Sequence, residues 1–355
     1  MSDQDTSRET RVRKLYRDIL VAGGIPGAVL ITLALIWLLW PIDSQQEQTG
    51  FRGTGMVQFT PEEDANRLAS LNVVPESQEP FIPAEGTPLA KDVYQNVQVL
   101  GNVDQNNFLR LMTAITEWVS PEQGCDYCHA GAAEGNYADD GLYTKIVSRR
   151  MIQMTQNINE NWQTHVKDTG VTCYTCHRGQ PVPQHIWFEE PRPEAASQLG
   201  MNTMSQNRAD ETVGYASLPG DPLTKFLLED NEIRVGAEVP RETPIGASIQ
   251  DTEWTYGLMF HFSYSLGVNC TFCHNSRAWN QWDQSPPTRA NAWFAIRMLR
   301  DLNQNYLHPL DVYPAKRLGP TGDAPKANCT TCHQGVNKPL YGVSMIDAWP
   351  ELQTT

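Results

Sequence analysis

The sequence predicts a mainly α-helical protein, built from helix–loop–Cys-x-x-Cys-His repeats in two pseudo-symmetric halves and preceded by one N-terminal transmembrane helix. Three observations carry this prediction. All eight cysteines of the 355-residue chain lie in four Cys-x-x-Cys-His motifs, a methionine-bearing helical pattern precedes each motif, and residues 19–42 form an uncharged apolar run. The length suffices for one large domain or two modest ones.

The apolar run reads ILVAGGIPGAVLITLALIWLLWPI, and about 20 apolar residues cross a bilayer as a helix. Arg52 is the first basic residue after the run, whereas five precede it: Arg8, Arg11, Arg13, Lys14 and Arg17. Positive charge favours the cytoplasmic side, so residues 1–18 are expected in the cytoplasm and the bulk of the chain outside. A cleaved signal peptide is the alternative, but the run is long for one and no small-x-small cleavage site follows.

Other residues of the run have local roles. Trp37 and Trp40 are expected at the outer membrane interface, where aromatic side chains gather. Pro26, with Gly23 and Gly27, indicates either a kink or a close helix contact, and a simple lipid-facing anchor fits equally well.

The four motifs are CDYCH at 125–129, CYTCH at 173–177, CTFCH at 270–274 and CTTCH at 329–333. This pattern is the attachment signature of c-type haem, in which two thiols form thioethers and the histidine binds the iron. A zinc site would not need a histidine directly after the cysteine pair, and a dithiol redox pair usually occurs once. We therefore expect four covalent haem c groups on Cys125, Cys128, Cys173, Cys176, Cys270, Cys273, Cys329 and Cys332, with His129, His177, His274 and His333 as proximal ligands.

Each iron also needs a distal ligand or an open position, for which methionine and histidine are the candidates. Helical patterns precede the motifs at 104–120, 141–158, 251–267 and 287–306, and they carry Met112, Met151 with Met154, Met259 and Met298, in that order. Methionine also fills irregular gaps in cores, so any one of them could be a packing residue. Their recurrence before four motifs favours iron ligation for the set.

The repeat is strongest between units two and four. RRMIQMTQN, around Met151, resembles IRMLRDLNQN, around Met298, and both helices are followed by long loops. Units one and three have short loops. This alternation predicts a duplicated two-haem module, with the Pro-rich segment 179–195 opening the connection between the halves.

Four histidines lie outside the motifs, at His165, His185, His261 and His308. His261 lies about 200° around a helix from Met259, so the two cannot face one haem. His185 falls in the Pro-rich segment and His308 precedes a proline, so these two and His261 are expected to be surface or packing residues. His165 follows the second helix.

The formal net charge is −14. This balance excludes nucleic-acid binding, which needs clustered Lys and Arg. It is compatible with a basic protein partner, because opposite charge speeds encounter.

Four such motifs, each preceded by a methionine-bearing helix, resemble the tetrahaem cytochrome subunit of bacterial photosynthetic reaction centres. The resemblance runs from about residue 90 to 335. It implies Met112 with His129, Met151 with His177 and Met259 with His274 as axial pairs, and His165 with His333 on the fourth iron. The repeat alone had favoured Met298 for that iron. Met154 and Met298 are then packing residues. Many relatives carry an N-terminal lipid-modified cysteine, which this chain lacks.

The expected segments are a cytoplasmic N-terminus (1–18), the anchor (19–42), an extended lead-in packing on partner subunits (43–90), haem module 1 (91–180), a connecting segment (181–250), haem module 2 (251–340) and a C-terminal tail (341–355). Arg289 and Arg297 are candidates for contact with haem propionates, with ordinary surface pairing as the alternative.

The resemblance implies an electron carrier without substrate chemistry of its own. It would sit in the photosynthetic inner membrane with a periplasmic haem domain, beside the bacteriochlorophyll-binding subunits. A soluble cytochrome c or high-potential iron–sulfur protein would reduce it, and the photo-oxidised bacteriochlorophyll pair would oxidise it. The haem of 270–274 would lie nearest that pair and the haem of 125–129 farthest away. The alternatives are a membrane-anchored tetrahaem quinol dehydrogenase, whose motifs are usually closer together, and a multihaem enzyme with one open iron.

Overall fold

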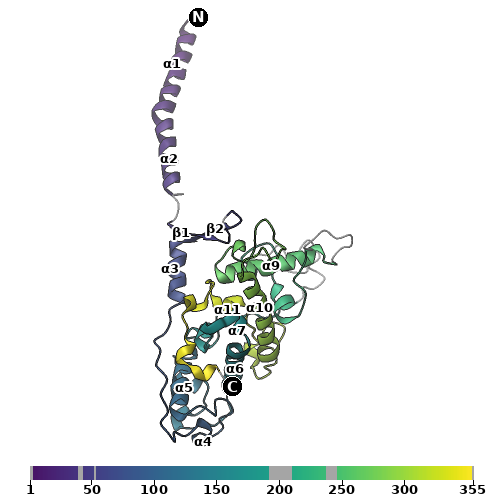
Figure 1. The fold of residues 1–355 in the computed structure, drawn as a ribbon. Helices are drawn as coiled ribbons and strands as arrows, with labels where there is room; N and C mark the ends of the chain where they lie inside the picture. The colour runs from purple at the N-terminus through teal and green to yellow at the C-terminus, as the bar shows by residue number, and fades with distance from the viewer. Residues whose placement is uncertain (1–2, 39–42, 52, 192–209, 237–245, 354–355) are drawn as a thin grey trace. The chain divides into compact units, whose positions relative to one another are not determined.

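The structure, a computed structural model, describes residues 3–38, 43–51, 53–191, 210–236 and 246–353 (Figure 1). The chain divides into two compact units, residues 1–46 with 59–66 and residues 47–58 with 67–355. Trp40 and parts of the predicted anchor and connecting segment lie outside the described residues.

The first unit holds one long helix, made of α1 (Asp3–Ile19), the π-helical η1 (Leu20–Gly24) and α2 (Ile25–Leu38). Residues Thr10–Leu38 are long and apolar enough to cross a membrane, and none of the most apolar stretch is buried in the protein. At about 1.5 Å per residue this helix exceeds the ~30 Å hydrocarbon core of a bilayer. It is therefore a candidate membrane span.

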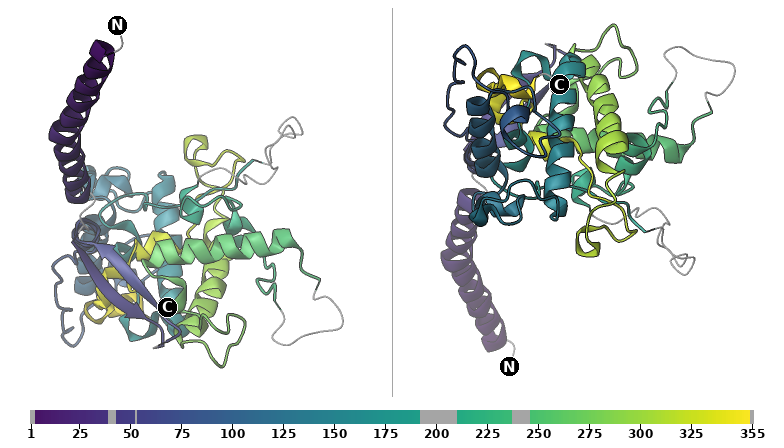
Figure 2. Two further views of the ribbon diagram at one scale, coloured as in Figure 1. Left: turned by 90° about the horizontal axis from the view of Figure 1, so that it is seen from above. Right: turned by 90° about the horizontal axis from the view of Figure 1, so that it is seen from below.

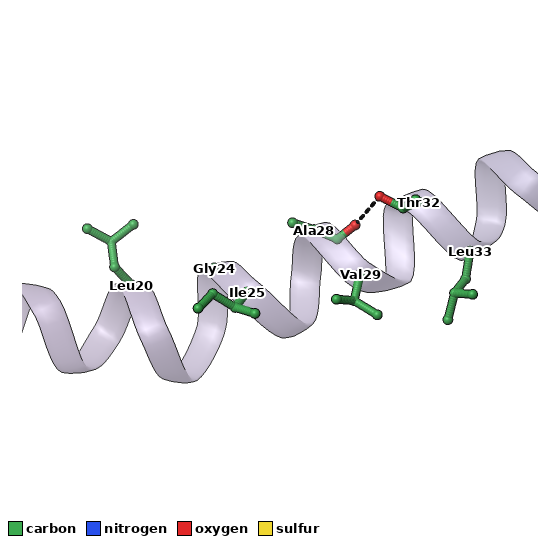
Figure 3. Close-up of a pocket in the computed structure, with 7 residues that line it drawn as sticks. All are labelled: Leu20, Gly24, Ile25, Ala28, Val29, Thr32 and Leu33. Atoms are coloured by element: carbon green, nitrogen blue, oxygen red, sulfur yellow. Dashed lines mark hydrogen bonds between the residues drawn. The ribbon is translucent and has the colours of Figure 1, made fainter.

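The π-helical turn lies directly before Pro26. Proline lacks an N–H and its ring crowds the carbonyl four residues earlier, which disturbs the preceding turn of an α-helix. Here the Ile25 N–H donates to Leu20 O, five residues back. A shallow apolar hollow lies here, lined in part by Gly24, which has no side chain, and by the small Ala28. Thr32 Oγ1 donates to Ala28 O at 2.8 Å (Figure 3). The helix thus changes type before Pro26, while a close helix contact at Gly23 and Gly27 stays a prediction.

A short two-stranded sheet follows, with β1 (Ser44–Thr49) pairing with β2 (Met56–Pro61), and then α3 (Glu62–Leu71). In the larger unit the hairpin contacts the third motif. Thr49 Oγ1 lies 3.1 Å from Thr271 Oγ1, which accepts from Met56 N at 2.8 Å. The predicted lead-in thus packs on this chain's own domain, while its packing on partner subunits stays a prediction.

The larger unit is mainly helical. Its α-helices are α4 (Ala90–Val93), α5 (Gln105–Val119), α6 (Tyr143–Asn161), α7 (Gln163–Val166), α8 (Cys173–His177), α9 (Ile249–Leu266), α10 (Thr288–Asp301) and α11 (Cys329–His333). Shorter 3-10 and π turns are η2 (Gly124–Tyr127), η3 (Ala132–Glu134), η4 (Lys167–Thr169), η6 (Glu211–Val213), η7 (Thr224–Leu228), η8 (Cys270–Phe272), η9 (Leu302–Leu307), η10 (Ala315–Arg317), η11 (Pro339–Gly342), η12 (Ile346–Ala348) and η13 (Pro350–Leu352).

The four predicted long helices are present as α5, α6, α9 and α10, and their ends have local causes. The Asp104 carboxylate accepts from Asn106 N and Asn107 N, which caps α5. Ser248 and Asp251 form a capping box at the start of α9. The expected helix 287–306 is α-helical only to Asp301 and continues as the π-helical η9.

One glycine at the end of α9 has no possible substitute. Gly267 has φ +63°, and a Cβ there would lie 2.1 Å from Gly335 O. Gly335 N in turn donates to Ser265 O at 2.9 Å, so α9 and the end of α11 touch through backbone. At the corresponding place Gly179 N donates to Trp118 O at 2.8 Å, joining the end of α8 to α5. The same contact thus occurs twice.

Two apolar clusters form the core of the larger unit. The first joins α5, α6 and α8 to the C-terminal turns, through residues such as Leu111, Trp118 and Leu352. The second joins η7, α9 and α10, through residues such as Phe226 and Leu258. Figures 1 and 2 show the C-terminal turns, in yellow, against α5.

The segment 341–355, expected as a tail, contributes to the first cluster. Trp349 is 3% exposed and meets Trp118 edge-on, with ring centroids 4.8 Å apart. The buried Arg110 guanidinium stacks over Trp349 at 4.0 Å and pairs with Glu351 at 2.7 Å. Breaking a buried ion pair leaves an uncompensated charge, so this segment is tied into the fold by charge as well as by apolar packing.

Candidate haem-binding sites

The four motifs adopt two backbone forms. Motifs two and four are the short helices α8 and α11, each begun by a capping box, Thr172 with Thr175 and Asn328 with Thr331. Motifs one and three lie at the tight turns η2 and η8, where His129 N and His274 N each donate to the carbonyl of the first cysteine at 3.0 Å. A bond four residues back closes one helical turn, so the cysteines and histidine of a motif lie on neighbouring positions of one face.

All four motif histidines are oriented through Nδ1. His129 bonds Tyr137 O (3.1 Å), His177 bonds Gln180 O (2.8 Å), His274 bonds Trp279 O (3.1 Å) and His333 bonds Val336 O (3.0 Å). A carbonyl can only accept, so Nδ1 carries the proton in each ring. Nε2 then keeps its lone pair, which is the arrangement found in metal-binding histidines.

Burial also keeps these imidazoles neutral. It is the largest cause of the lowered pKa of His129, His177 and His274, and it lowers the pKa of His333 to about 4. A metal ligand must be the neutral imidazole, so the four rings are in the state that iron requires near neutral pH.

None of the eight motif cysteines is in a disulfide bond. Motifs two and four lie against each other, with Cys176 Sγ 2.8 Å from Cys332 Sγ and Arg178 Nη2 donating to Cys332 O at 3.3 Å. Segments more than 150 residues apart in sequence therefore meet here.

His165 lies beside the fourth motif. It sits on α7, and its ring centroid is 6.1 Å from that of His333. A metal–imidazole bond is about 2 Å long and the centroid lies about 1 Å beyond the nitrogen, so two imidazoles on opposite sides of one metal have centroids about 6 Å apart. The observed separation matches. His165 Nδ1 also bonds Asn291 Oδ1 at 3.3 Å, which again leaves Nε2 available.

Helix α6, and helix α10 together with its continuation η9, each contact two motifs in the same way. Near the start of each helix a threonine hydroxyl donates to a carbonyl directly before the second motif cysteine, Thr144 to Tyr127 O and Thr288 to Phe272 O. Later in the chain an asparagine side chain binds both backbone groups of the residue two positions before a motif. Asn159 does so with Val171 (2.9 and 2.7 Å), and Asn303 with Ala327 (3.0 and 2.9 Å).

This equivalence corrects the register of the sequence repeat. Thr144 and Asn159 are separated by as many residues as Thr288 and Asn303. In that register Met298 matches Met154, and Ala295 stands where the second unit has Met151. In this register the match of RRMIQMTQN to IRMLRDLNQN is wrong by three residues. Both stretches contain an Arg-Met pair, but the pairs lie at different positions along their helices.

The methionines differ in their packing. Met298 is 7% exposed and belongs to the second core cluster, against which Met154 and Met259 also pack. Met112 packs on the first cluster, whereas Met151 is in neither. Met298 thus behaves as a core side chain.

The remaining sequence candidates have other partners. His261 is 1% exposed and bonds Thr212 O through Nδ1 at 3.0 Å. Arg289 stacks over Trp282 at 4.1 Å and Arg297 over Trp293 at 3.6 Å. His261 is thus a packing residue, as expected. Thr144, Asn159 and Asn303 escaped the sequence reasoning, since a polar side chain within a helix gives no sign of a distant backbone partner.

Cysteine pairs, each next to a histidine whose Nδ1 bonds a backbone carbonyl, on a mainly helical fold, define a c-type cytochrome. The family model described as "Photosynthetic reaction centre cytochrome C subunit" matches residues 40–353. The chain belongs to this family.

Proteins named photosynthetic reaction center cytochrome c subunit are similar over most of the chain. That of Thermochromatium tepidum is 49% identical over 312 residues, covering 87% of this chain and 75% of the relative. That of Rubrivivax gelatinosus is 48% identical over 319 residues (88% and 84%), and that of Roseobacter denitrificans is 47% identical over 356 residues (96% and 94%). The protein is thus a haem-carrying electron-transport subunit of the photosynthetic reaction centre, associated with its membrane subunits.

Proposed function

We propose that the subunit carries four haem c groups, one on each motif, and conducts electrons from a soluble periplasmic donor to the photo-oxidised bacteriochlorophyll pair. The bound haems supply one-electron redox chemistry, and no substrate bond is made or broken. The observation that carries the proposal is the shared arrangement of the four motif histidines, each held through Nδ1 with Nε2 free.

The proposed axial ligands combine a motif histidine with a second side chain. Met112, Met151 and Met259 would bind the irons of the haems on the motifs of His129, His177 and His274, and His165 would bind the iron of the haem on the motif of His333. The 6.1 Å separation of the His165 and His333 rings supports the last pair. Thioether ligation raises a haem potential relative to two imidazoles, so the fourth haem would be a low-potential member of the row.

The chain is proposed to contain two related haem modules, 91–180 and 251–340, joined by the segment 181–250. Support comes from equivalent contacts in the two modules. Thr144 and Thr288 each donate to a motif carbonyl, and Asn159 and Asn303 each bind the backbone two residues before a motif. Helix α6 in one module, and α10 with η9 in the other, thus each contact two motifs. The N-terminus would be cytoplasmic and both modules periplasmic, since basic residues cluster before the apolar helix. A cytochrome c or high-potential iron–sulfur protein would be the donor.

The haem content of the purified subunit tests the proposal. A pyridine haemochrome assay on a chain of known concentration should give four covalent haems. Replacing both cysteines of one motif, Cys270→Ala with Cys273→Ala, should give three. A wild-type value below four would overturn the assignment of one haem to each motif.

A further inference from the structure

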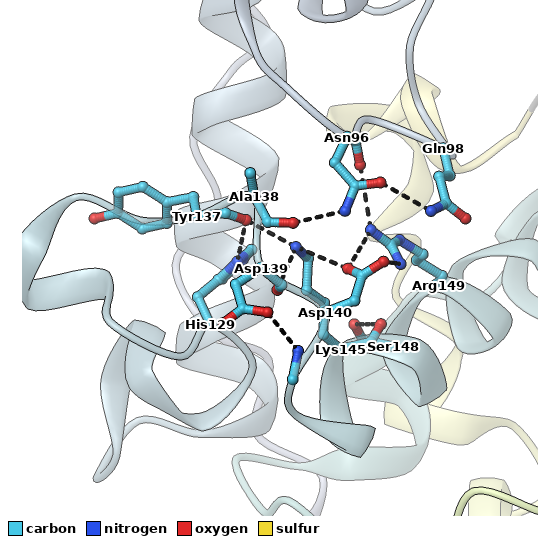
Figure 4. A network of polar contacts seen from close by, with 11 residues as sticks. Asn96, Gln98, His129, Tyr137, Ala138, Asp139, Asp140, Lys145, Ser148 and Arg149 are labelled. Atoms are coloured by element: carbon cyan, nitrogen blue, oxygen red, sulfur yellow. Dashed lines mark hydrogen bonds and ion pairs between the residues drawn. The ribbon is translucent and has the colours of Figure 1, made fainter.

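At the first motif, a lysine binds the same backbone carbonyl as the motif histidine. Tyr137 O, which accepts from His129 Nδ1 at 3.1 Å, also accepts from Lys145 Nζ at 2.8 Å (Figure 4). Lys145 lies on α6, one residue after Thr144. The contacts described for Gln180 O, Trp279 O and Val336 O are those with the other three motif histidines.

The Lys145 side chain is buried beside the first motif and bonded to several groups there. The side chain is 7% exposed; Nζ donates to Tyr137 O and Asp139 O at 2.8 Å and forms an ion pair with Asp140 Oδ1 at 3.0 Å. A buried lysine normally loses its charge unless it is paired and hydrogen-bonded. Lys145 is both paired and hydrogen-bonded, so its side chain is held in place beside the first motif.

Arg149 completes the cluster. It pairs with the same carboxylate, Nη2 to Asp140 Oδ1 at 2.8 Å and Nη1 to Oδ2 at 3.0 Å. Two cations thus share one carboxylate beside His129. The neighbouring Asp139 carboxylate bonds within its own loop, where Oδ1 accepts from Gly141 N.

We propose that Lys145 is a positioning residue that raises the reduction potential of the first haem. The inference rests on the proposed assignment of a haem to 125–129. Two effects act in the same direction. A positive charge near the iron disfavours the ferric state, which carries one more positive charge than the ferrous state. By sharing Tyr137 O, the ammonium also weakens the carbonyl as acceptor for His129 N–H, and the imidazole becomes a poorer donor to ferric iron.

Neutralising Lys145 tests this inference. Lys145→Gln should make the first haem harder to reduce. At the ambient potential where half of that haem is reduced in the wild type, the reduced-to-oxidised ratio should fall about tenfold, which corresponds to about 59 mV for one electron. Lys145→Arg, which keeps the charge, should stay near the wild type. Lys91→Gln removes an exposed lysine that donates to Asn102, and it should move no potential.

The opposite change uses the carboxylate of the same cluster. Asp140→Asn leaves both cations in place and removes the negative charge, so the first haem should become easier to reduce. This variant tests the inference even if Lys145→Gln does not fold. Shifts of opposite sign, confined to one of four transitions in a spectroelectrochemical titration, support the proposal. A haem-loaded pair of variants with unchanged potentials would refute it.

A chain that lacks the first haem tests which haem Lys145 acts on. In a chain that also carries Cys125→Ala and Cys128→Ala, Lys145→Gln should leave the remaining three potentials unchanged. A shift there would place the effect of Lys145 on another haem. If the wild-type chain contained no haem at 125–129, the proposed function would be wrong independently of Lys145.

Discussion

The ligand of the fourth iron can be tested at one residue. His165 is the proposed ligand and Met298 the alternative that the sequence repeat favoured. His165→Met should raise the lowest haem potential, because thioether ligation favours ferrous iron more than imidazole does. The expected change in the reduced-to-oxidised ratio is at least tenfold, about 59 mV. Redox titration followed by visible and EPR spectra measures it.

Met298→Leu is the matched control. Volume-conserving exchanges in a core usually cost less than about 1.5 kcal/mol of unfolding free energy, and all four potentials should stay unchanged. A spectral change in Met298→Leu with none in His165→Met would reverse the assignment. An effect of His165→Met on the second haem alone would also contradict it.

Residues differ in how well the sequence reveals them. The cysteines and the histidine of each motif are close together in sequence, so their chemistry can be recognised without knowledge of the fold. His165 could be assigned only through a family resemblance, because its partner lies more than 160 residues later. Lys145 had no signature, since its role depends on a carbonyl eight residues earlier that also binds His129.

At the scale of elements, α6, and α10 with its continuation η9, hold the motifs in place through side-chain contacts to the motif backbone. Asn159→Ala should destabilise the approach to the second motif, and Asn303→Ala the approach to the fourth. Each change removes hydrogen bonds to both backbone groups of Val171 or Ala327. A buried polar group left without a partner costs about 1–3 kcal/mol, so each variant should lose at least that much unfolding free energy.

Chemical denaturation of the haem-loaded protein measures these losses, with Asn102→Ala on an exposed loop as control. Asn102 accepts only from the exposed Lys91 among the described contacts, and its removal should be nearly neutral. Equal unfolding free energies for all three variants would show that the hydrogen bonds of Asn159 and Asn303 do not stabilise the protein.

The long helices could be predicted because amphipathic periodicity and caps are local signals. The C-terminal turns could not. η11, η12 and η13 are too short for periodicity, and Trp349 and Glu351 acquire their roles only through Trp118 and Arg110. The register error between α6 and α10 has a similar origin. Threonine and asparagine contacts to distant carbonyls define the equivalence better than the Arg-Met pairs do.

At the scale of the whole molecule, the chain combines a candidate membrane helix with a domain in which the second and fourth motifs, more than 150 residues apart, meet. His165 on α7 beside His333, and Cys176 beside Cys332, bring the second and fourth units together. Such proximity suits electron transfer between the proposed haems. The proposed donor and orientation rest on the family and on charge.

The central claim is electron delivery to the bacteriochlorophyll pair, and a flash measurement tests it most directly. In membranes that contain this subunit and photoactive pigment, a single flash should oxidise a haem within about microseconds to milliseconds. The haem oxidation should follow the time course with which the oxidised pair is re-reduced. Re-reduction of the pair without haem oxidation, in membranes shown to hold the four-haem subunit, would contradict the account.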